Sequence, residues 1–229
     1  LFTAIPSIAV HWAKLLIILS AFTILYGNLC AIPQRNLKRL LGYSSIAHAG
    51  YLLLGVAALN NAGQSAVLYY LSGYLFTTLA AFTVIALVMR HLDNEDILGL
   101  AGLNERSPLL ATTMTLAMVS LAGIPPLAGF FGKFLLLKAV IEKGPANYGY
   151  YWLAFTALVG VVVSLYYYYT IMAAALHHAD QAIADIMRDY KGQYILAVEG
   201  NAPLGNDGTF CIPGGRPFLD KLKEVAADA

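Results

Sequence analysis

Apolar residues gather into five long runs that are separated by short polar stretches. A helix needs about 20 mostly apolar residues to cross the roughly 30 Å hydrocarbon layer of a bilayer. Each run meets that length, so the pattern predicts an all-α, multi-span membrane bundle of about five transmembrane helices. The predicted crossings are residues 12–32, 40–59, 66–89, 108–141 and 150–173.

The fourth run is too long for one straight crossing and contains the sequence GIPPLAG at residues 123–129. Proline lacks an amide donor and clashes with the preceding turn of a helix. Unpaired backbone at membrane depth is tolerated only where protein or a water-filled cavity covers it. We therefore predict two half-helices, with a break at Pro125, Pro126 and Gly129 that is covered by protein or water.

The pattern changes near residue 174, where the chain takes on the charge density of a soluble protein. The order of segments predicts a helix, a short buried strand at 194–198, a Gly/Pro-rich loop and a helix from about Pro217. This is a short C-terminal α/β fragment. A piece of fewer than about 60 residues with one strand cannot bury a sizeable core by itself, so we expect it to be poorly docked.

Composition agrees with a membrane protein, because 59% of the 229 residues are hydrophobic and 12% are charged. The net charge of +1 lacks the clustered positive charge that nucleic acid requires, so no nucleic-acid partner is expected. Two cysteines, Cys30 and Cys211, supply neither a disulfide framework nor a set of metal ligands. We expect no cofactor and no metal. The chain begins inside an apolar stretch without a charged leader, which predicts a truncated N-terminus.

Basic residues are distributed unequally between the two ends of the predicted helices, and cytoplasmic loops carry an excess of them. The richer end is therefore expected to be cytoplasmic, and the fifth helix would deliver the C-terminal tail to that side. The richer end holds Arg35, Lys38, Arg39, Arg90 and Arg106, whereas the opposite end holds Lys14, Lys138 and Lys143.

Lys133 follows the predicted break with no acidic residue close by in the sequence. A charged lysine at membrane depth costs several kcal/mol, and such residues are functional by default. Beside a break that admits water, Lys133 can take up and release a proton. The alternative is a lysine that extends to the membrane surface, but Lys138 and Lys143 already mark that surface. We expect Lys133 to point into the bundle.

Lys38 lies at the mouth of the second predicted helix, and His48 lies within it. His48 lies about three turns inside it, where a histidine can pass protons near neutral pH or can be a core residue bonded to a hydroxyl. Lys38 can act at the mouth of the same path or serve only to set topology. Both alternatives stay open. The tyrosines of 66–89 are expected to pack helices, and SLYYYY at 164–169 predicts an interfacial aromatic belt.

Three stretches closely resemble the antiporter-like subunit N of bacterial NADH-quinone oxidoreductase (respiratory complex I): GNLCAIPQRNLKRLLGYSSIAHAGYLLLG, AMVSLAGIPPLAGFFGKF and GVVVSLYYYY. The resemblance covers about residues 1–169, which correspond to the later spans of that family. It implies that Lys133 holds the lysine position in the hydrophilic axis of a proton path. His48 and Lys38 match polar positions of the preceding channel-lining helix. A multi-pass fragment in the bacterial inner membrane is implied, with the bilayer and other membrane subunits of complex I as partners.

Residues 170–229 instead resemble the small subunit of membrane-bound nickel-iron hydrogenases, in its flavodoxin-like domain. The stretches TIMAAA, YILAVEGN and GRPFLDKLK support that resemblance, which implies a chimera of domains 1–169 and 170–229. Glu199 falls on a glutamate beside an iron-sulfur cluster. The cysteines of that cluster are absent, and one thiolate cannot hold a cluster that takes four. A hydrogenase large subunit would be a partner only of a complete tail.

Three functions follow. The favoured one is a proton-translocating fragment of NADH-quinone oxidoreductase, without a redox centre of its own. The second is a membrane-anchored hydrogenase fragment for electron transfer, and the third is a structural or interaction protein without transport. Iron content separates the second from the others, and proton flux that depends on Lys133 separates the first from the third.

Overall fold

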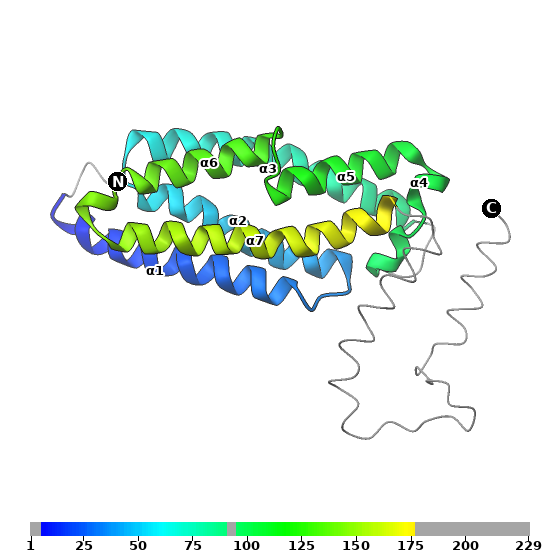
Figure 1. Ribbon diagram of the computed structural model, residues 1–229, viewed down its shortest axis with the longest axis horizontal. Coiled ribbons are helices and arrows are strands. Elements are labelled where there is room, and N and C mark those ends of the chain that lie inside the picture. Colours follow the sequence, from blue (N-terminus) through cyan, green and yellow to red (C-terminus); the bar gives the residue numbers. More distant parts are fainter. Residues whose placement is uncertain (1–5, 91–94, 177–229) are drawn as a thin grey trace, which may run out of the picture. The chain divides into compact units, whose positions relative to one another are not determined.

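The computed structural model describes residues 6–90 and 95–176, and all regular structure in this part of the chain is helical. The described helices lie within one compact unit, Leu1–Ala179. The helical bundle predicted from the sequence is thus confirmed, whereas the predicted strand at 194–198 and the α/β fragment lie outside the described residues. The elements are α1 (Pro6–Ala31), α2 (Leu37–Ala57), α3 (Asn61–Val88), η1 (Ile97–Leu100), α4 (Leu103–Arg106), α5 (Pro108–Ala122), α6 (Ala128–Ile141), η2 (Gly144–Ala146) and α7 (Gly149–Leu176) (Figure 1).

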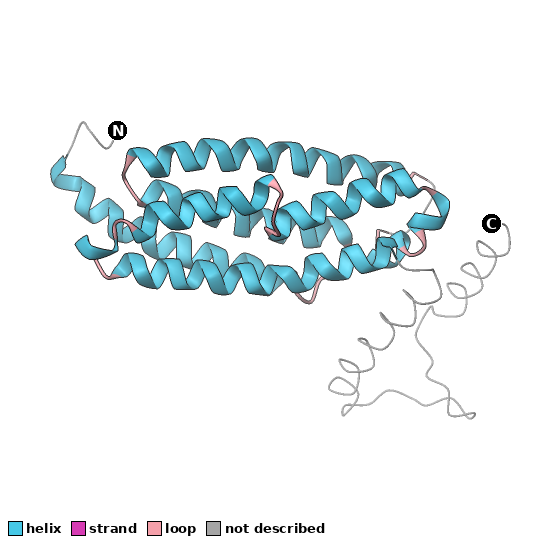
Figure 2. Cartoon of the chain, turned by 45° about the horizontal axis from the view of Figure 1, so that its top comes forward, coloured by secondary structure: helices cyan, strands magenta, loops and turns pink. Residues whose placement is uncertain are grey.

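Among the described residues, four helices are long and apolar enough to cross a membrane: Trp12–Ala31 within α1, then α2, α3 and α7. The fifth crossing is divided. Helices α5 and α6 contain 15 and 14 residues and follow one another in nearly the same line, with α3 running alongside both (Figure 1). Figure 2 shows the short loop that separates them. The two half-helices predicted from the sequence are therefore present.

The break extends from Gly123 to Leu127 and begins where the backbone turns left-handed at Gly123. Gly123 has φ 87°, a left-handed conformation that glycine adopts without steric cost, and its N–H donates to the carbonyls of Val119 and Ser120. Pro125 and Pro126 then supply no amide hydrogen, so they cannot continue the helix. The break is shorter than predicted, because Gly129 lies in the first turn of α6.

Helices α1 and α2 pack at close range because glycine faces backbone on both sides of their contact. A side chain at Gly27 would meet the backbone of Ala47, and one at Gly50 would meet Ile24. Helix α7 reaches the same region through Gly160, where any Cβ would meet Ile24. These contacts hold α2 in the interior, where 11 of its 21 residues are buried.

One end of the bundle is fastened by a short antiparallel bridge between Asn36 and Asp96. Across it, Leu37 N–H donates to Glu95 O and Ile97 N–H donates to the carbonyl of Arg35. The bridge ties the segment after α3 to the start of α2. We call this region the basic end, because it gathers the ends of α1, α2 and α3 that hold the predicted cytoplasmic set of basic residues. The side of the membrane on which it lies stays a prediction.

Helix α7 is longer than the predicted segment 150–173 and continues to Leu176. It passes through residue 170, the predicted start of the second domain, without interruption. A junction between two sequences at this point would therefore lie inside a continuous helix.

Candidate functional site

Lys133 lies on the second turn of α6 and points into the bundle, with 4% of its surface exposed. Its ammonium donates to the carbonyls of Leu121 (2.7 Å) and Ala122 (3.0 Å), the last two residues of α5. The last carbonyls of a helix have no partner within it and carry the negative end of its dipole. Lys133 of α6 thus caps the C-terminal end of α5. Its side chain points into the bundle, as the sequence predicts.

The space around Lys133 is narrow. A Cβ added to Gly123 would lie 3.0 Å from its Cδ, so glycine at this position also leaves room for the lysine. On another side the ammonium lies 5.2 Å from the centre of the Tyr51 ring, within the range of a cation–π contact. The polar contacts described for Lys133 are therefore carbonyls and an aromatic face rather than a carboxylate.

His48 lies on the inner face of α2, with 3% of its surface exposed, and both ring nitrogens are hydrogen-bonded. Nδ1 lies 2.5 Å from the Tyr70 hydroxyl of α3, and Nε2 lies 2.8 Å from the Tyr168 hydroxyl of α7. The Tyr168 hydroxyl is bonded in turn to the hydroxyl of Ser44, one turn back on α2. A neutral imidazole donates through one nitrogen and accepts through the other. These groups, Tyr70, His48, Tyr168 and Ser44, form a continuous hydrogen-bonded chain that we call the His48 chain.

Two tyrosines connect the His48 chain with the surroundings of Lys133. The Tyr51 ring is 6.2 Å from the His48 ring between centres and also lies beneath the Lys133 ammonium. Tyr70 packs against α6 at Gly132, the residue before Lys133, where any side chain would collide with its ring. Helices α2, α3, α6 and α7 therefore bring the two predicted interior residues into one buried polar region.

Lys38 does not belong to this region. Its side chain is about half exposed at the start of α2, and its Nζ lies 2.5 Å from Glu95 Oε1. The Lys38 hydrogen bond, with a second one from Asn36, lowers the pKa of the Glu95 carboxyl. Ten residues of helix separate Lys38 from His48, which corresponds to about 15 Å along the axis. A role for Lys38 in proton transfer stays a prediction.

The prolines of the break lie on the outside of the described bundle. Pro125 and Pro126 are exposed, as is Ile124, whereas Lys133 occupies the inner side of the break. The described residues therefore cover the break from one side only, and its cover by protein or water on the other side stays a prediction. Neither proline has an N–H group to satisfy, and the N–H groups of Gly123 and Ile124 are bonded to α5.

The aromatic belt predicted for SLYYYY is wrong for its two central tyrosines. Tyr167 and Tyr168 are 1% exposed, whereas Tyr169 is 60% exposed. The helical period aligns the two buried rings with Ser164 and Ile171, which are also buried. Tyr168 joins the His48 chain, and Tyr167 donates to Asn28 Oδ1 at 2.9 Å.

Tyr70 is a second residue whose position in the site was not predicted, since α3 was expected to contribute packing alone. The only signal for Tyr70 in the sequence is its helical spacing from Gly63 and Ala66, which are also buried. Among the described residues, no three histidine, cysteine or acidic side chains are grouped so that they could hold a metal ion. Glu199 and Cys211 lie outside these residues.

Comparisons with known proteins give one consistent result. The family model described as "NADH:quinone oxidoreductase/Mrp antiporter, TM" matches residues 1–164. The chain is 46% identical over 158 residues to NADH-quinone oxidoreductase subunit N of Desulforamulus reducens, covering 69% of this chain and 32% of that protein. It is 44% identical over 173 residues to subunit N of Moorella thermoacetica, with 76% and 35% covered. The chain thus spans about a third of the length of the curated relatives it matches.

Solved structures agree with the sequence matches. A chain of respiratory complex I from Thermus thermophilus with bound aureothin superimposes with a TM-score of 0.60 and 37% identity, over 72% of this chain and 36% of that one. A chain of the Mrp complex from a Dietzia species gives a TM-score of 0.64 and 28% identity, with 71% and 30% covered.

Proposed function

The chain belongs to the NADH:quinone oxidoreductase/Mrp antiporter family of transmembrane proteins, and on that premise we propose that it is part of a proton-translocating subunit of the subunit N type. It is a multi-pass membrane protein. The observation that carries the proposal is the buried Lys133, which shares the Tyr51 ring as a neighbour with a buried histidine whose ring nitrogens are both hydrogen-bonded. The other membrane subunits of an NADH-quinone oxidoreductase are the proposed partners, in the bacterial inner membrane.

The His48 chain can transfer protons by the exchange of hydrogen bonds. His48 accepts a proton at one nitrogen and releases another proton from the opposite nitrogen, so the charge crosses the ring without movement of the residue. Tyr70 and Tyr168 each accept one proton and donate one, and rotation of each hydroxyl restores the starting arrangement. The chain thereby connects α3 with α7 through α2.

Lys133 supplies the site that holds the charge. Two carbonyls and the Tyr51 ring stabilise its ammonium, and no carboxylate of the described residues is in contact with it. Positive charges on Lys133 and His48 would repel strongly at the low effective dielectric of the interior, since a single tyrosine ring separates the two groups. We infer that the region holds one excess proton at a time, so that a proton arriving at His48 favours release from Lys133.

The test is proton translocation by the membrane complex that contains this subunit, reconstituted in vesicles with a pH-sensitive dye. Lys133→Met keeps much of the side-chain volume and removes the titrating group, so pumping should be lost while the complex assembles. Lys133→Arg is the matched variant, because it retains the charge but does not release its proton, and it should fail as well. Normal pumping by the Met variant would contradict the proposal.

For residues 170–229 we propose an appendage related to nickel-iron hydrogenase small subunits, without a function of its own. The motifs TIMAAA, YILAVEGN and GRPFLDKLK support it, and the family match ends at residue 164, before them. Purified protein should contain no iron, and limited proteolysis should remove residues 175–229 before the membrane helices. Sequencing the source DNA across codons 160–180 tests the junction directly. A protease-resistant tail with stoichiometric iron would instead support the hydrogenase function.

A further inference from the structure

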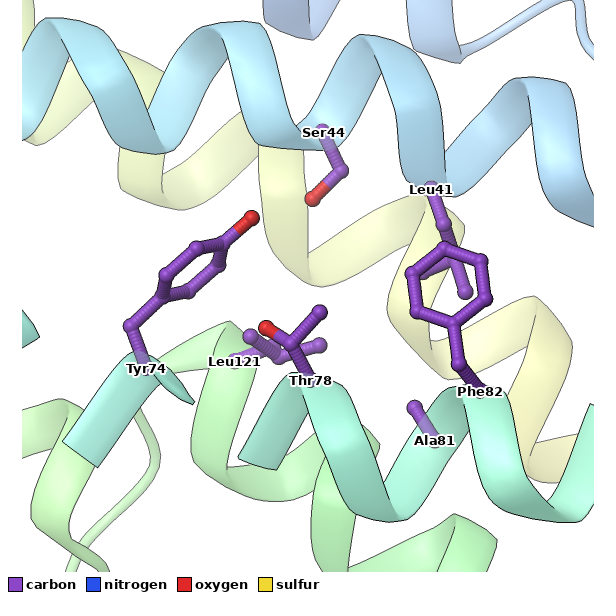
Figure 3. Close-up of a pocket in the computed structure, with 7 residues that line it drawn as sticks. All are labelled: Leu41, Ser44, Tyr74, Thr78, Ala81, Phe82 and Leu121. Carbon is purple, nitrogen blue, oxygen red and sulfur yellow. The ribbon is translucent and has the colours of Figure 1, made fainter. Parts of the chain in front are cut away.

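A small cavity lies between α2, α3 and α5, beside the His48 chain (Figure 3). Its polar lining consists of Ser44, Tyr74 and Thr78, and its apolar lining includes Leu41 and Phe82. The centre of a water molecule can occupy about 10 Å³ in it, which is close to the space that one water needs. The lining also includes Leu121 of α5, whose carbonyl accepts the hydrogen bond from Lys133.

Thr78 departs from the behaviour of the other helical threonines. Its hydroxyl oxygen is buried and, alone among the buried side-chain polar atoms of the described residues, has no hydrogen-bond partner. Every other threonine in the described helices donates to the carbonyl four residues earlier, the usual arrangement in an apolar environment. Those threonines are Thr23, Thr77, Thr83, Thr112, Thr113, Thr115, Thr156 and Thr170.

The Thr78 hydroxyl instead points into the cavity, on the side of the Tyr74 hydroxyl (Figure 3). An unsatisfied buried hydroxyl costs free energy, so native proteins pair such groups with protein or with ordered water. A buried water typically has two to four polar partners. Thr78, Tyr74 and Ser44 supply three hydroxyl groups around the same small space.

The cavity is continuous with the site on its inner side. The Ser44 hydroxyl is bonded to Tyr168, which is bonded to His48. The Tyr74 ring lies 4.7 Å from the His48 ring between centres. On the side toward the basic end the cavity is lined by Leu41, which lies one turn after Lys38 on α2. It therefore lies between His48 and the basic end.

We propose that this cavity is a water-binding site, held by the Thr78 hydroxyl, that extends the His48 chain toward the basic end. The inference rests on the proposed function for its role in transport, although water binding itself does not. A proton added to the bound water passes to the Ser44 oxygen while Ser44 gives its own proton to Tyr168. Tyr168 then gives a proton to His48 Nε2. The water, Ser44 and Tyr168 each gain one proton and lose one, and His48 carries the added proton.

The experiment compares Thr78→Val with Thr78→Ser in the full subunit within its membrane complex. Valine has nearly the shape of threonine without the hydroxyl, whereas serine keeps the hydroxyl. Radicals formed by X-rays from bound water oxidise adjacent side chains, and mass spectrometry measures oxidation of Tyr74 relative to the exposed Tyr148. We expect oxidation of Tyr74 to fall about fivefold in Thr78→Val, the factor that corresponds to one lost hydrogen bond. Thr78→Ser should behave as the original chain.

Proton translocation is measured on the same samples. Thr78→Val should slow it, Thr78→Ser should retain it, and Lys133→Met should abolish it. Unchanged oxidation of Tyr74 in Thr78→Val, or an equal loss in both variants, would overturn the water site. Normal translocation by Thr78→Val with reduced oxidation would overturn its place in the path. Normal pumping by Lys133→Met would reject the proposed function and leave the oxidation result to decide water binding alone.

Discussion

Lys133 and Lys38 carry the same functional group in two opposite regions of the molecule. Lys38 is exposed at the basic end and pairs with a carboxylate. Lys133 is buried at the break and donates to two backbone carbonyls. Exposed ion pairs contribute little to stability, because water serves each partner nearly as well. A buried lysine has no such substitute, so its surroundings determine whether it keeps its proton.

The role of a basic residue in a membrane protein thus depends on the groups that accept its hydrogen bonds. A basic residue paired with a carboxylate at the surface serves to hold two segments together. Here Lys38 joins the start of α2 to the segment after α3. The acceptors of Lys133 in the interior are neutral carbonyls, so they do not cancel its charge. The net charge around Lys133 is then that of the lysine itself. Such a region changes its charge whenever the proton leaves.

We expect the largest loss of stability from a substitution that disturbs the helix packing near Lys133, compared with a similar substitution near Lys38. In Gly129→Ala, in the first turn of α6 directly after the break, the new Cβ would overlap the carbonyl oxygen of Ser120 on α5. We expect a loss of about 3 kcal/mol. Gly42→Ala, one turn after Lys38, is the matched control, since its Cβ would meet nothing within 4 Å. Thermal unfolding in detergent measures both, and equal melting temperatures would show that the break is not tightly packed.

A smaller effect is expected from removing one hydroxyl of the interior. Tyr168→Phe leaves His48 Nε2 and Ser44 each without a buried partner, which should cost about 2 kcal/mol. Tyr169→Phe changes the adjacent exposed ring and should stay within about 0.5 kcal/mol. Denaturant unfolding followed by tyrosine fluorescence gives the comparison. A Tyr168 variant as stable as the Tyr169 variant would mean that these bonds contribute nothing net.

The basic end should respond to acid, and only slightly. The pKa of Glu95 is lowered in the folded state by Lys38 and Asn36. Its contribution to stability is therefore fully present above the unfolded pKa, about 4.3, and is lost as pH falls through the folded pKa. Melting temperature measured against pH should show this loss at low salt, and about 1 M salt should weaken it. Glu95→Gln should remove the salt-dependent part, and an unchanged curve in that variant would assign the loss to other groups.

The smallest change is expected from Lys38→Met in the translocation assay. Lys38 is exposed and about three turns away from His48, so most of the pumping rate should remain, whereas Lys133→Met should remove it. Loss of pumping in both variants would end the contrast between the two lysines. It would establish the basic end as a station of the path, an alternative that the sequence leaves open.

The sequence was sufficient for the helices and for the place of the break. Two consecutive prolines cannot continue a helix, so local chemistry alone placed the division between α5 and α6. Likewise, the cost of a charge in lipid was enough to predict that Lys133 points inward. Gly129 was assigned to the break because glycine permits an irregular backbone, but here it permits close packing of α6 against the Ser120 carbonyl.

The partners within the site could not be obtained in the same way. A run of four tyrosines has no contrast between apolar and polar positions, so it does not indicate which of them turn inward. Tyr168 is buried because α7 packs with Gly160 and Ser164 toward its neighbours, a tertiary contact that the local pattern does not contain. The carbonyl acceptors of Lys133 lie 11 and 12 residues earlier, and only the three-dimensional path of the break brings them close.

The two hydrogen bonds of Lys133 are also sensitive to any displacement of α6 relative to α5. Their donor belongs to α6 and their acceptors belong to α5, so their length depends on the relative position of the two half-helices. A shift of about 1 Å between the segments would stretch the shorter bond beyond a useful length. Loss of the proton from Lys133 and a displacement of α6 relative to α5 would thus weaken the same two hydrogen bonds. Each event would therefore favour the other.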